Sequence, residues 1–160
     1  LIIPIILFIL MGINFLDHMQ NNNHIDILKK MKFEKIGVFH IEKNQFIVDC
    51  YEKFNELEKM IYIHTIDNEI VRIGSSKNKL KIRMRSWERD VSKSLDNRTS
   101  STPIWEGKAW REILKNKKGV LYGRQGSMVK TDAGLFNAYL SEESYLIGKF
   151  SPKMNRSKHR

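Results

Sequence analysis

The chain has 160 residues, of which 41% are hydrophobic, and this length suits one compact domain. Its 28 Lys and Arg residues outnumber its 18 Asp and Glu residues, and the resulting net charge of +10 favours a polyanionic partner. The single cysteine, Cys50, excludes a disulfide framework within the chain and a zinc site built on cysteines, and it favours a reducing, cytoplasmic setting.

The positive charge is concentrated in one part of the chain. Residues 1–70 carry 7 basic and 10 acidic side chains, a net charge of −3, whereas residues 71–160 carry 21 basic and 8 acidic side chains, a net charge of +13. Lys and Arg contacts to phosphate provide affinity and salt dependence, but they do not read sequence by themselves. We therefore expect any nucleic-acid contacts to come from residues 71–160.

The first 30 residues are treated as an N-terminal extension. Leu1 to Leu16 is uncharged and apolar, but it is shorter than the roughly 20 residues of a bilayer span and no basic residue precedes it as in a signal peptide. Three interpretations of this stretch stay open: it does not belong to the native protein, it forms a buried helix, or it is a membrane anchor. The first is considered because the chain begins with Leu rather than Met. We expect the folded domain to begin near residue 31 and to need no membrane.

Strand patterns dominate the next part of the chain. Loose alternation over 32–50 predicts two strands around a turn at Glu42–Asn44, and residues 51–60 have the spacing of a short helix. Met60–Ile66 and Ile70–Gly74 predict a hairpin joined by the turn residues Asp67, Asn68 and Glu69.

Helical periodicity begins near Asn78. Four apolar residues spaced i, i+4, i+7 and i+11 predict one buried helix face: Leu80, Met84, Trp87 and Val91. A polar loop over 96–102 follows, and Pro103 is placed to open a second helix.

The remaining elements are a strand, an ambiguous segment and a helix. Val120–Gly123 predicts a third strand, and residues 129–139 fit no single pattern. Ser141 is the expected N-cap of a last helix that carries Glu142 and Glu143 in its first turn. Residues 156–160 form a basic tail.

Two groups of residues resemble the signature of the GIY-YIG nucleases. The first is Met60-Ile61-Tyr62, then Arg72-Ile73-Gly74-Ser75-Ser76-Lys77-Asn78 and Arg83; the second is Glu143-Ser144-Tyr145-Leu146-Ile147 with Pro152 and Asn155. The resemblance covers residues 59–155 and is most similar to the type II restriction endonucleases of that superfamily. It implies an α+β fold in which a small three-stranded antiparallel sheet is flanked by helices, with a domain over 31–155 and a basic insertion at 88–140.

The resemblance also implies roles at a catalytic centre. Tyr62 matches the residue proposed to deprotonate the attacking water, Arg83 matches a phosphate-binding Arg, and Glu143 matches the single carboxylate that holds Mg²⁺. Arg72 stands where the family has its second tyrosine, so a fixed cation replaces a phenol. From spacing alone, Tyr62 can equally be a strand residue that fills the sheet, Arg83 a solvated or DNA-backbone residue, and Glu143 a first-turn carboxylate stabilised by the helix dipole.

Four further residues are supporting candidates: His64, Ser76, Asn78 and Asn155. His64 lies on the same strand face as Tyr62 and is a candidate to replace the relay residue, since Trp87 occupies the helix position where the family often has His or Tyr. Ser76 and Asn78 are expected to shape the loop before the helix. Met60 in place of Gly is the remaining departure from the signature.

The resemblance and the charge together favour hydrolysis of double-stranded DNA by a homodimer that cuts at specific sites. A solvated basic face is the simpler explanation for the candidate DNA-binding residues, which are Lys77, Lys81, Arg85, Arg89, Lys93, Arg98, Lys108, Arg111 and Arg124. Two other functions stay open: a DNA-binding module on this fold that no longer cuts, and a repair or mobile-element nuclease.

Overall fold

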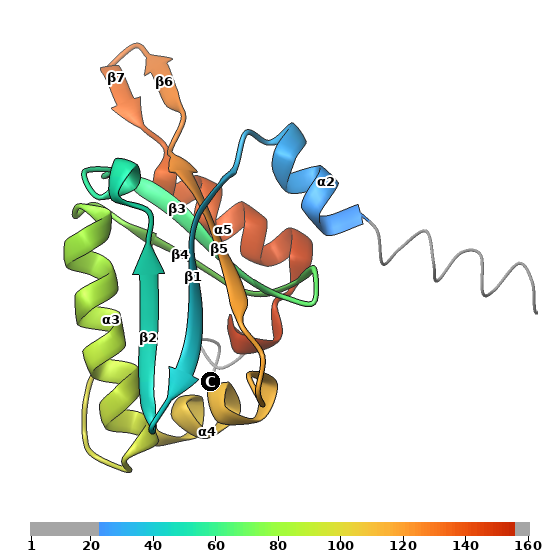
Figure 1. Ribbon diagram of the computed structural model, residues 1–160. Coiled ribbons are helices and arrows are strands. Elements are labelled where there is room, and N and C mark those ends of the chain that lie inside the picture. The colour runs from blue at the N-terminus through green and yellow to red at the C-terminus, as the bar shows by residue number, and fades with distance from the viewer. Residues whose placement is uncertain (1–22, 156–160) are drawn as a thin grey trace, which may run out of the picture.

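The computed structural model describes residues 23–155, and it is a mixed α+β structure (Figure 1). The elements in chain order are α2 (Asn23–Lys30), β1 (Glu34–Glu42), β2 (Gln45–Cys50), the 3-10 helix η1 (Glu52–Phe54), β3 (Met60–Ile66), β4 (Glu69–Ser76), α3 (Leu80–Leu95), α4 (Ile104–Ile113), β5 (Gly119–Gln125), β6 (Met128–Thr131), β7 (Gly134–Asn137) and α5 (Tyr139–Phe150). The apolar stretch 1–16 and the basic tail 156–160 lie outside the described residues.

The main sheet has five strands, so the expectation of a three-stranded sheet is wrong. The strand order is β2-β1-β5-β3-β4, and all neighbouring strands are antiparallel. The sheet is larger because β5 lies in its centre and pairs with β3 on one side and with β1 on the other. The hairpin β1–β2 therefore extends the same sheet, and β4 is left as one of its two edge strands.

Helices cover both faces of this sheet, and the alternation in β3 separates two cores. Met60 and Tyr62 pack into an aromatic-rich core with α3 and α4. Ile61 and Ile63 pack on the opposite face, in a smaller core with α2 and α5. Leu28 of α2 is fully buried in this second core, although its helix falls within the segment treated as an extension.

The apolar stripe of α3 is buried as the spacing predicts. Leu80, Met84, Trp87 and Val91 are each at most 2% exposed and join the core of the Tyr62 face. The opposite side of the helix is polar and faces solvent, which is the pattern of an amphipathic surface helix. This packing holds α3 against β2 and α4, and it places Arg83, the fourth residue of the helix, within hydrogen-bonding distance of Tyr62 on β3.

The ambiguous segment 129–139 forms most of a second, two-stranded sheet. β6 and β7 pair only with each other, and the hairpin projects from the end of the main sheet (Figure 1). α5 then begins at Tyr139, so the prediction that Ser141 is its N-cap is wrong. The side chain of Asn137 instead accepts a hydrogen bond from the backbone N–H of Tyr139 at 3.1 Å, and Glu142 and Glu143 remain near the start of the helix.

None of the helices within residues 23–155 combines the length and the apolar composition that a membrane span requires.

Candidate active site

Tyr62 and Arg83 form a two-point hydrogen-bonded pair. The phenolic oxygen of Tyr62 accepts bonds from Arg83 Nε at 3.0 Å and from Arg83 Nη2 at 2.8 Å. Strand β3 supplies the tyrosine and helix α3 the arginine, so the pair joins two packed elements. The bonds fix the guanidinium plane, and among the described residues the third nitrogen, Nη1, has no recorded partner. The arginine can thus hold Tyr62 and still offer a donor to an anion.

Gly74 provides the room for the Tyr62 ring. The two residues face each other across the β3–β4 pair. A Cβ atom at position 74 would lie 2.5 Å from Tyr62 Cζ and 2.6 Å from its hydroxyl oxygen, which is well inside contact distance. The ring therefore extends over β4 towards the edge of the sheet. The glycine of the second motif is explained by this contact, which only a residue without a side chain allows.

Glu143 reaches the same edge strand from α5. Its Oε2 accepts a hydrogen bond from Ser75 Oγ at 2.6 Å, and Ser75 directly follows Gly74 in β4. Tyr62 and Glu143 therefore contact consecutive residues of the edge strand. Because β3 and β4 alternate, the two side chains approach these residues from opposite faces of the sheet. The fold thus brings both halves of the sequence signature to one short stretch of the β4 edge.

The neighbouring carboxylate, Glu142, is already engaged by other protein groups. Arg124 Nη2 lies 2.8 Å from Glu142 Oε1, and Ser127 donates to both carboxylate oxygens through its hydroxyl and its backbone N–H. Burial alone would raise the pKa of Glu142, but the hydrogen bonds from Arg124 and Ser127 outweigh it and lower the pKa. By contrast, Oε1 of Glu143 has no recorded protein partner within the described part of the chain. Of the two residues, Glu143 is the one free to bind a ligand.

Arg72 forms no hydrogen bond with Tyr62 within the described residues, although its position in the motif places it among the candidate catalytic residues. It forms an ion pair with Glu106 of α4, and both side chains are largely buried. Its guanidinium carbon also lies 5.5 Å from the centre of the Trp87 ring. Arg72 therefore ties β4 to α3 and α4. Sequence reasoning missed Glu106, because the two partners are 34 positions apart and only the tertiary fold brings them together.

His64 lies in the aromatic core. It is fully buried, its ring packs 4.2 Å from that of Trp87 and 5.6 Å from that of Tyr62, and neither ring nitrogen has a hydrogen-bond partner. Burial, reinforced by the positive charges of Arg72 and Arg83, holds its pKa well below the ordinary value. The imidazole is therefore neutral at physiological pH, and it touches the tyrosine by packing rather than through a hydrogen bond.

The remaining supporting candidates stabilise backbone near the site. The Asn155 amide donates to the carbonyl oxygen of Ile73 and accepts from its N–H, both at 2.8 Å, so it pairs with the outer edge of β4 as a further strand would. Ser76 Oγ accepts a bond from the N–H of Asn78 at 3.0 Å, which shapes the turn into α3 as expected.

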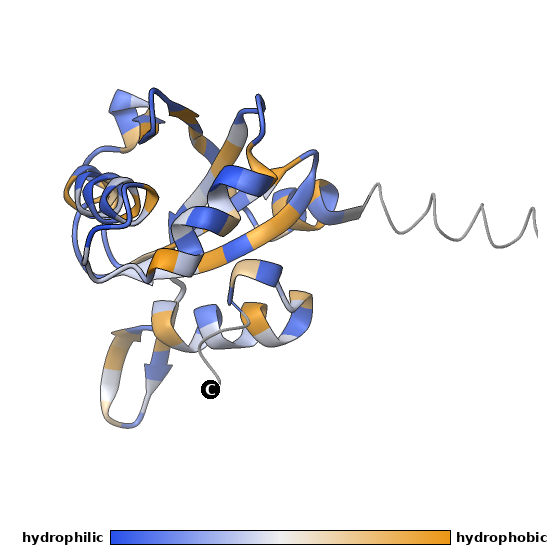
Figure 2. Ribbon diagram, turned by 90° about the horizontal axis from the view of Figure 1, so that it is seen from below, coloured by the Kyte–Doolittle hydropathy of each residue, from blue (hydrophilic) through white to orange (hydrophobic). Residues whose placement is uncertain are grey.

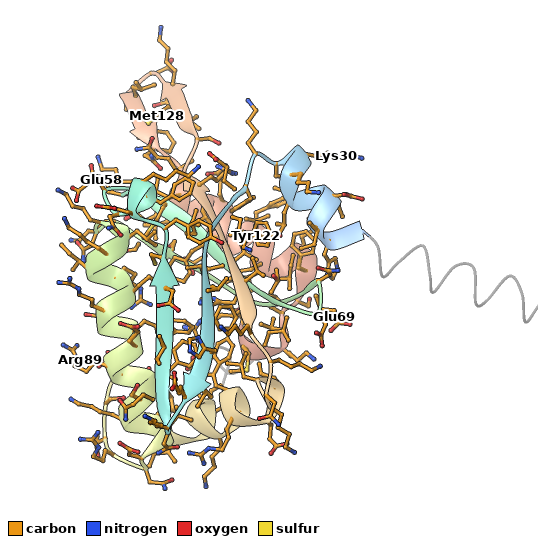
Figure 3. All side chains as sticks on the ribbon, in the orientation of Figure 1. Lys30, Glu58, Glu69, Arg89, Tyr122 and Met128 are labelled. Carbon is orange, nitrogen blue, oxygen red and sulfur yellow. The ribbon has the colours of Figure 1, made fainter. Side chains whose placement is uncertain are left out.

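The candidate DNA-binding residues fall into two groups. Several are occupied within the fold: Lys81 by Glu56, Arg98 by Asp96, Arg111 by Asn44 and the carbonyl of Leu95, and Arg124 by Glu142. Lys77, Arg85, Arg89 and Lys108 are exposed, and Lys93 is half-buried. Arg89 extends outward from α3 (Figure 3), although its Nε donates to Asp90 at 3.1 Å. The exposed group provides positive charge at the surface of α3, of α4 and of the turn before α3.

Among the residues that the structure describes, the site offers a divalent cation one free carboxylate oxygen, that of Glu143, rather than a complete set of protein ligands. No group of three or more His, Cys, Asp or Glu side chains within residues 23–155 is arranged to hold a metal ion. One carboxylate with several water molecules is, however, the usual protein environment of Mg²⁺. The free Oε1 of Glu143 fits that pattern.

Comparison with known proteins gives structural neighbours. No family model matches the chain, and no curated protein does. The structure of a mutant of EndoII from bacteriophage T4 aligns with a TM-score of 0.57 and 19% identity over 82% of this chain and 98% of that one. The restriction endonuclease HPY188I in complex with product DNA aligns with a TM-score of 0.50 and 14% identity over 86% of each chain. This chain shares its fold with these two proteins.

Proposed function

We propose that this chain is a GIY-YIG-type endonuclease that hydrolyses phosphodiester bonds of double-stranded DNA with the help of a divalent cation. The observation that carries the proposal is that the Tyr62–Arg83 pair and Glu143 reach consecutive residues of the β4 edge from its two faces. The shared fold supports it, since one neighbour is a restriction endonuclease bound to product DNA.

The chain's own residues provide two of the three requirements of the reaction. Hydrolysis forms a bond from a water oxygen to phosphorus and breaks the bond to the leaving sugar oxygen. The water must therefore lose a proton, the phosphate charge must be balanced, and the leaving oxygen must be stabilised. Arg83 places its free donor and its charge on a phosphate oxygen. Tyr62, oriented by two bonds from Arg83, presents its oxygen to the attacking water as the proton acceptor.

Glu143 would hold the divalent cation through its free carboxylate oxygen, and Ser75 orients that carboxylate. When bound, such an ion stabilises charge on the phosphate and on the leaving oxygen. Arg72 acts in this scheme as a positioning residue, because its guanidinium is committed to Glu106 and Trp87.

Site-specific cutting of both strands favours a homodimer, and the β6–β7 hairpin is the surface that we propose for it. A symmetric site in DNA is matched by a symmetric pair of subunits. The hairpin exposes four large apolar side chains, namely Met128, Val129, Leu135 and Phe136. Its two charges, Lys130 and Asp132, cancel, although the chain as a whole carries +10. A neutral apolar surface on a cationic protein suits a second copy better than it suits DNA.

The test is cleavage of unmethylated plasmid and phage DNA by the purified protein with Mg²⁺. Tyr62→Phe, Arg83→Ala and Glu143→Gln are each expected to lower the cleavage rate at least about 100-fold, the range for loss of one group that stabilises a transition state. Glu142→Gln is the matched control, since it changes the adjacent carboxylate that Arg124 and Ser127 occupy. Circular dichroism checks that each variant is folded.

The outcomes separate the alternatives. Discrete fragments that disappear in the three site variants and persist in Glu142→Gln support a site-specific nuclease. Undiminished cutting by Glu143→Gln rules out the metal assignment. DNA binding without any cutting by the wild type would favour the inactive binding module, for which the replacement of a tyrosine by Arg72 provides a reason.

A further inference from the structure

A cavity of about 310 Å³ adjoins the Tyr62–Arg83 pair on the α3–α4 side of the sheet. It lies between β4, the middle of α3, the loop before α4 and the first turn of α4. The side chains that decide its chemistry are Arg72, Arg83, Trp87, Asp90, Trp105 and Glu106. Arg83 thus belongs both to the cavity and to the pair with Tyr62, and a group bound in the cavity would sit beside a phosphate held by Arg83.

Two residues that line this cavity carry buried hydrogen-bond donors without partners. Trp87 is only 2% exposed and its indole Nε1 has no recorded partner, and the same holds for Nε of the largely buried Arg72. An unsatisfied buried N–H destabilises the folded protein. Both nitrogens are buried beneath the lining of the cavity, so a bound group that accepts hydrogen bonds reaches them only if the Trp87 or Arg72 side chain shifts.

The charges around the cavity exclude an anion as its best occupant. The guanidinium groups of Arg72 and Arg83 are balanced by the carboxylates of Asp90 and Glu106. A phosphate would gain the two cations but would also face the two carboxylates, whereas a neutral ligand with both donors and acceptors can be matched on every side. The edge of a nucleobase has this character.

Trp105 supplies the flat apolar surface that a base requires. It lies in the first turn of α4, lines the cavity and is 42% exposed. The neighbouring residue Ile104 is 41% exposed but does not line the cavity. Stacking of a base on an aromatic side chain contributes about 1–3 kcal/mol and does not depend strongly on which base is bound.

We infer that this cavity binds a nucleobase, unstacked from the duplex, whose flanking phosphate lies at Arg83. The base stacks on Trp105, and the balanced charges of Arg72, Arg83, Asp90 and Glu106 surround its polar edge. The inference rests on the proposed function, since it takes DNA as the substrate. Unstacking a base costs free energy, and the cost is lowest when the base is unpaired. DNA with an unpaired base should therefore bind more tightly than a fully paired duplex.

The experiment measures binding by fluorescence anisotropy in EDTA, so that no cleavage occurs. The probes are two labelled duplexes of the same sequence, one fully paired and one with a single unpaired adenine. The wild type is expected to prefer the second duplex about tenfold. Trp105→Ala should reduce that preference at least about 5-fold, the factor that about 1 kcal/mol of lost stacking represents. Ile104→Ala, the matched control, should leave the preference unchanged.

Two results would overturn the inference: equal affinity of the wild type for both duplexes, or a loss in Trp105→Ala that is the same for both. The second result would make Trp105 a general DNA contact. Cleavage with Mg²⁺ is measured separately on the same proteins. Cleavage without a preference for the unpaired base would contradict the base pocket and support the nuclease activity. A preference for the unpaired base without cleavage would support the pocket and contradict the nuclease activity.

Discussion

At the scale of single residues, the contact between Gly74 and Tyr62 determines where the phenolic oxygen lies. A methyl group at position 74 would overlap the ring, so Gly74→Ala must displace Tyr62 from Arg83 or distort the β3–β4 pair. We expect a loss of about 1–3 kcal/mol in the free energy of unfolding, as for other overpacked sites. Urea denaturation measures this loss.

Gly148→Ala is the matched control, since no atom lies within 4 Å of a Cβ at that position of α5. This change should stabilise the protein by up to about 1 kcal/mol, because alanine is the better helix former. A double-mutant cycle locates the cause of the Gly74 effect: with Tyr62→Ala already present, Gly74→Ala should cost about 0.5 kcal/mol or less. An equal cost in both backgrounds would show that the tyrosine ring is not what the glycine accommodates.

The burial of His64 should make the folded protein less stable at acid pH. Its pKa in the folded protein lies well below the ordinary value of 6.5, so the unfolded chain binds the proton more readily. Above about pH 6.5, His64 does not lower the free energy of unfolding. As the pH falls from 6.5 to 5.5, protonation of His64 in the unfolded chain should lower that free energy by about 1 kcal/mol.

The replacement His64→Phe tests this pH dependence. It should remove that part of the pH dependence and leave stability at pH 7.5 equal or higher, because it also removes two unpartnered nitrogens. Urea denaturation at pH 7.5, 6.5 and 5.5 compares the two proteins. If the wild type and the variant lose the same free energy of unfolding as the pH falls, the acid sensitivity comes from groups other than His64.

The sequence provides candidate site residues, but it does not provide their partners. Tyr62, Arg83 and Glu143 are candidates because they match a nuclease signature in type and spacing, and their catalytic roles remain predictions. The partner of Arg72 could not be identified, since an ion pair with Glu106 depends on how α4 packs against the sheet. For the same reason His64 could be placed on the Tyr62 face of β3 but not recognised as fully buried.

At the scale of elements, Asn155 bonds the C-terminal segment after α5 to the edge of the sheet, and Met154 of the same segment is buried in the core of the Tyr62 face. Asn155 satisfies both backbone groups of Ile73 on the outer edge of β4, where the next strand would otherwise bind. Asn155→Ala should cost about 2–4 kcal/mol in the free energy of unfolding, since it leaves two backbone groups of a buried residue without partners. Amide hydrogen exchange gives a local measure: the N–H of Ile73 should exchange faster in the variant, and unchanged protection would contradict the proposed role.

Local patterns located most elements, but pairing between distant strands determined the sheet. The alternation over 32–50 predicted β1 and β2 correctly, yet their membership of the main sheet depends on pairing with β5, which lies about 80 residues further along the chain. β6 and β7 could not be recognised because they are four residues long and fully or partly exposed, so no face of them repeats an apolar pattern. The start of α5 was missed because Asn137, rather than Ser141, bonds its first N–H.

At the scale of the whole molecule, the two surfaces with an assigned role differ in charge. Exposed cationic residues on and near α3 and α4 suit DNA, whereas the projecting hairpin is neutral overall and carries hydrophobic residues (Figure 2). A two-stranded hairpin without further packing is marginally stable in water. Association of two copies through the hairpin would bury its apolar side chains and would place two sites on one duplex.

The double variant Leu135→Ser/Phe136→Ser tests this arrangement, since these side chains are 66% and 46% exposed and their loss should not disturb the core. Sedimentation equilibrium should show dimers for the wild type and monomers for the variant, with Lys130→Ser on the same hairpin as the control that remains dimeric. In the plasmid assay, a monomer that still holds Tyr62, Arg83 and Glu143 should nick one strand and accumulate open circles before linear product forms. The hairpin is not the dimer interface if the wild type is monomeric or if the variant dimerises as strongly as the wild type.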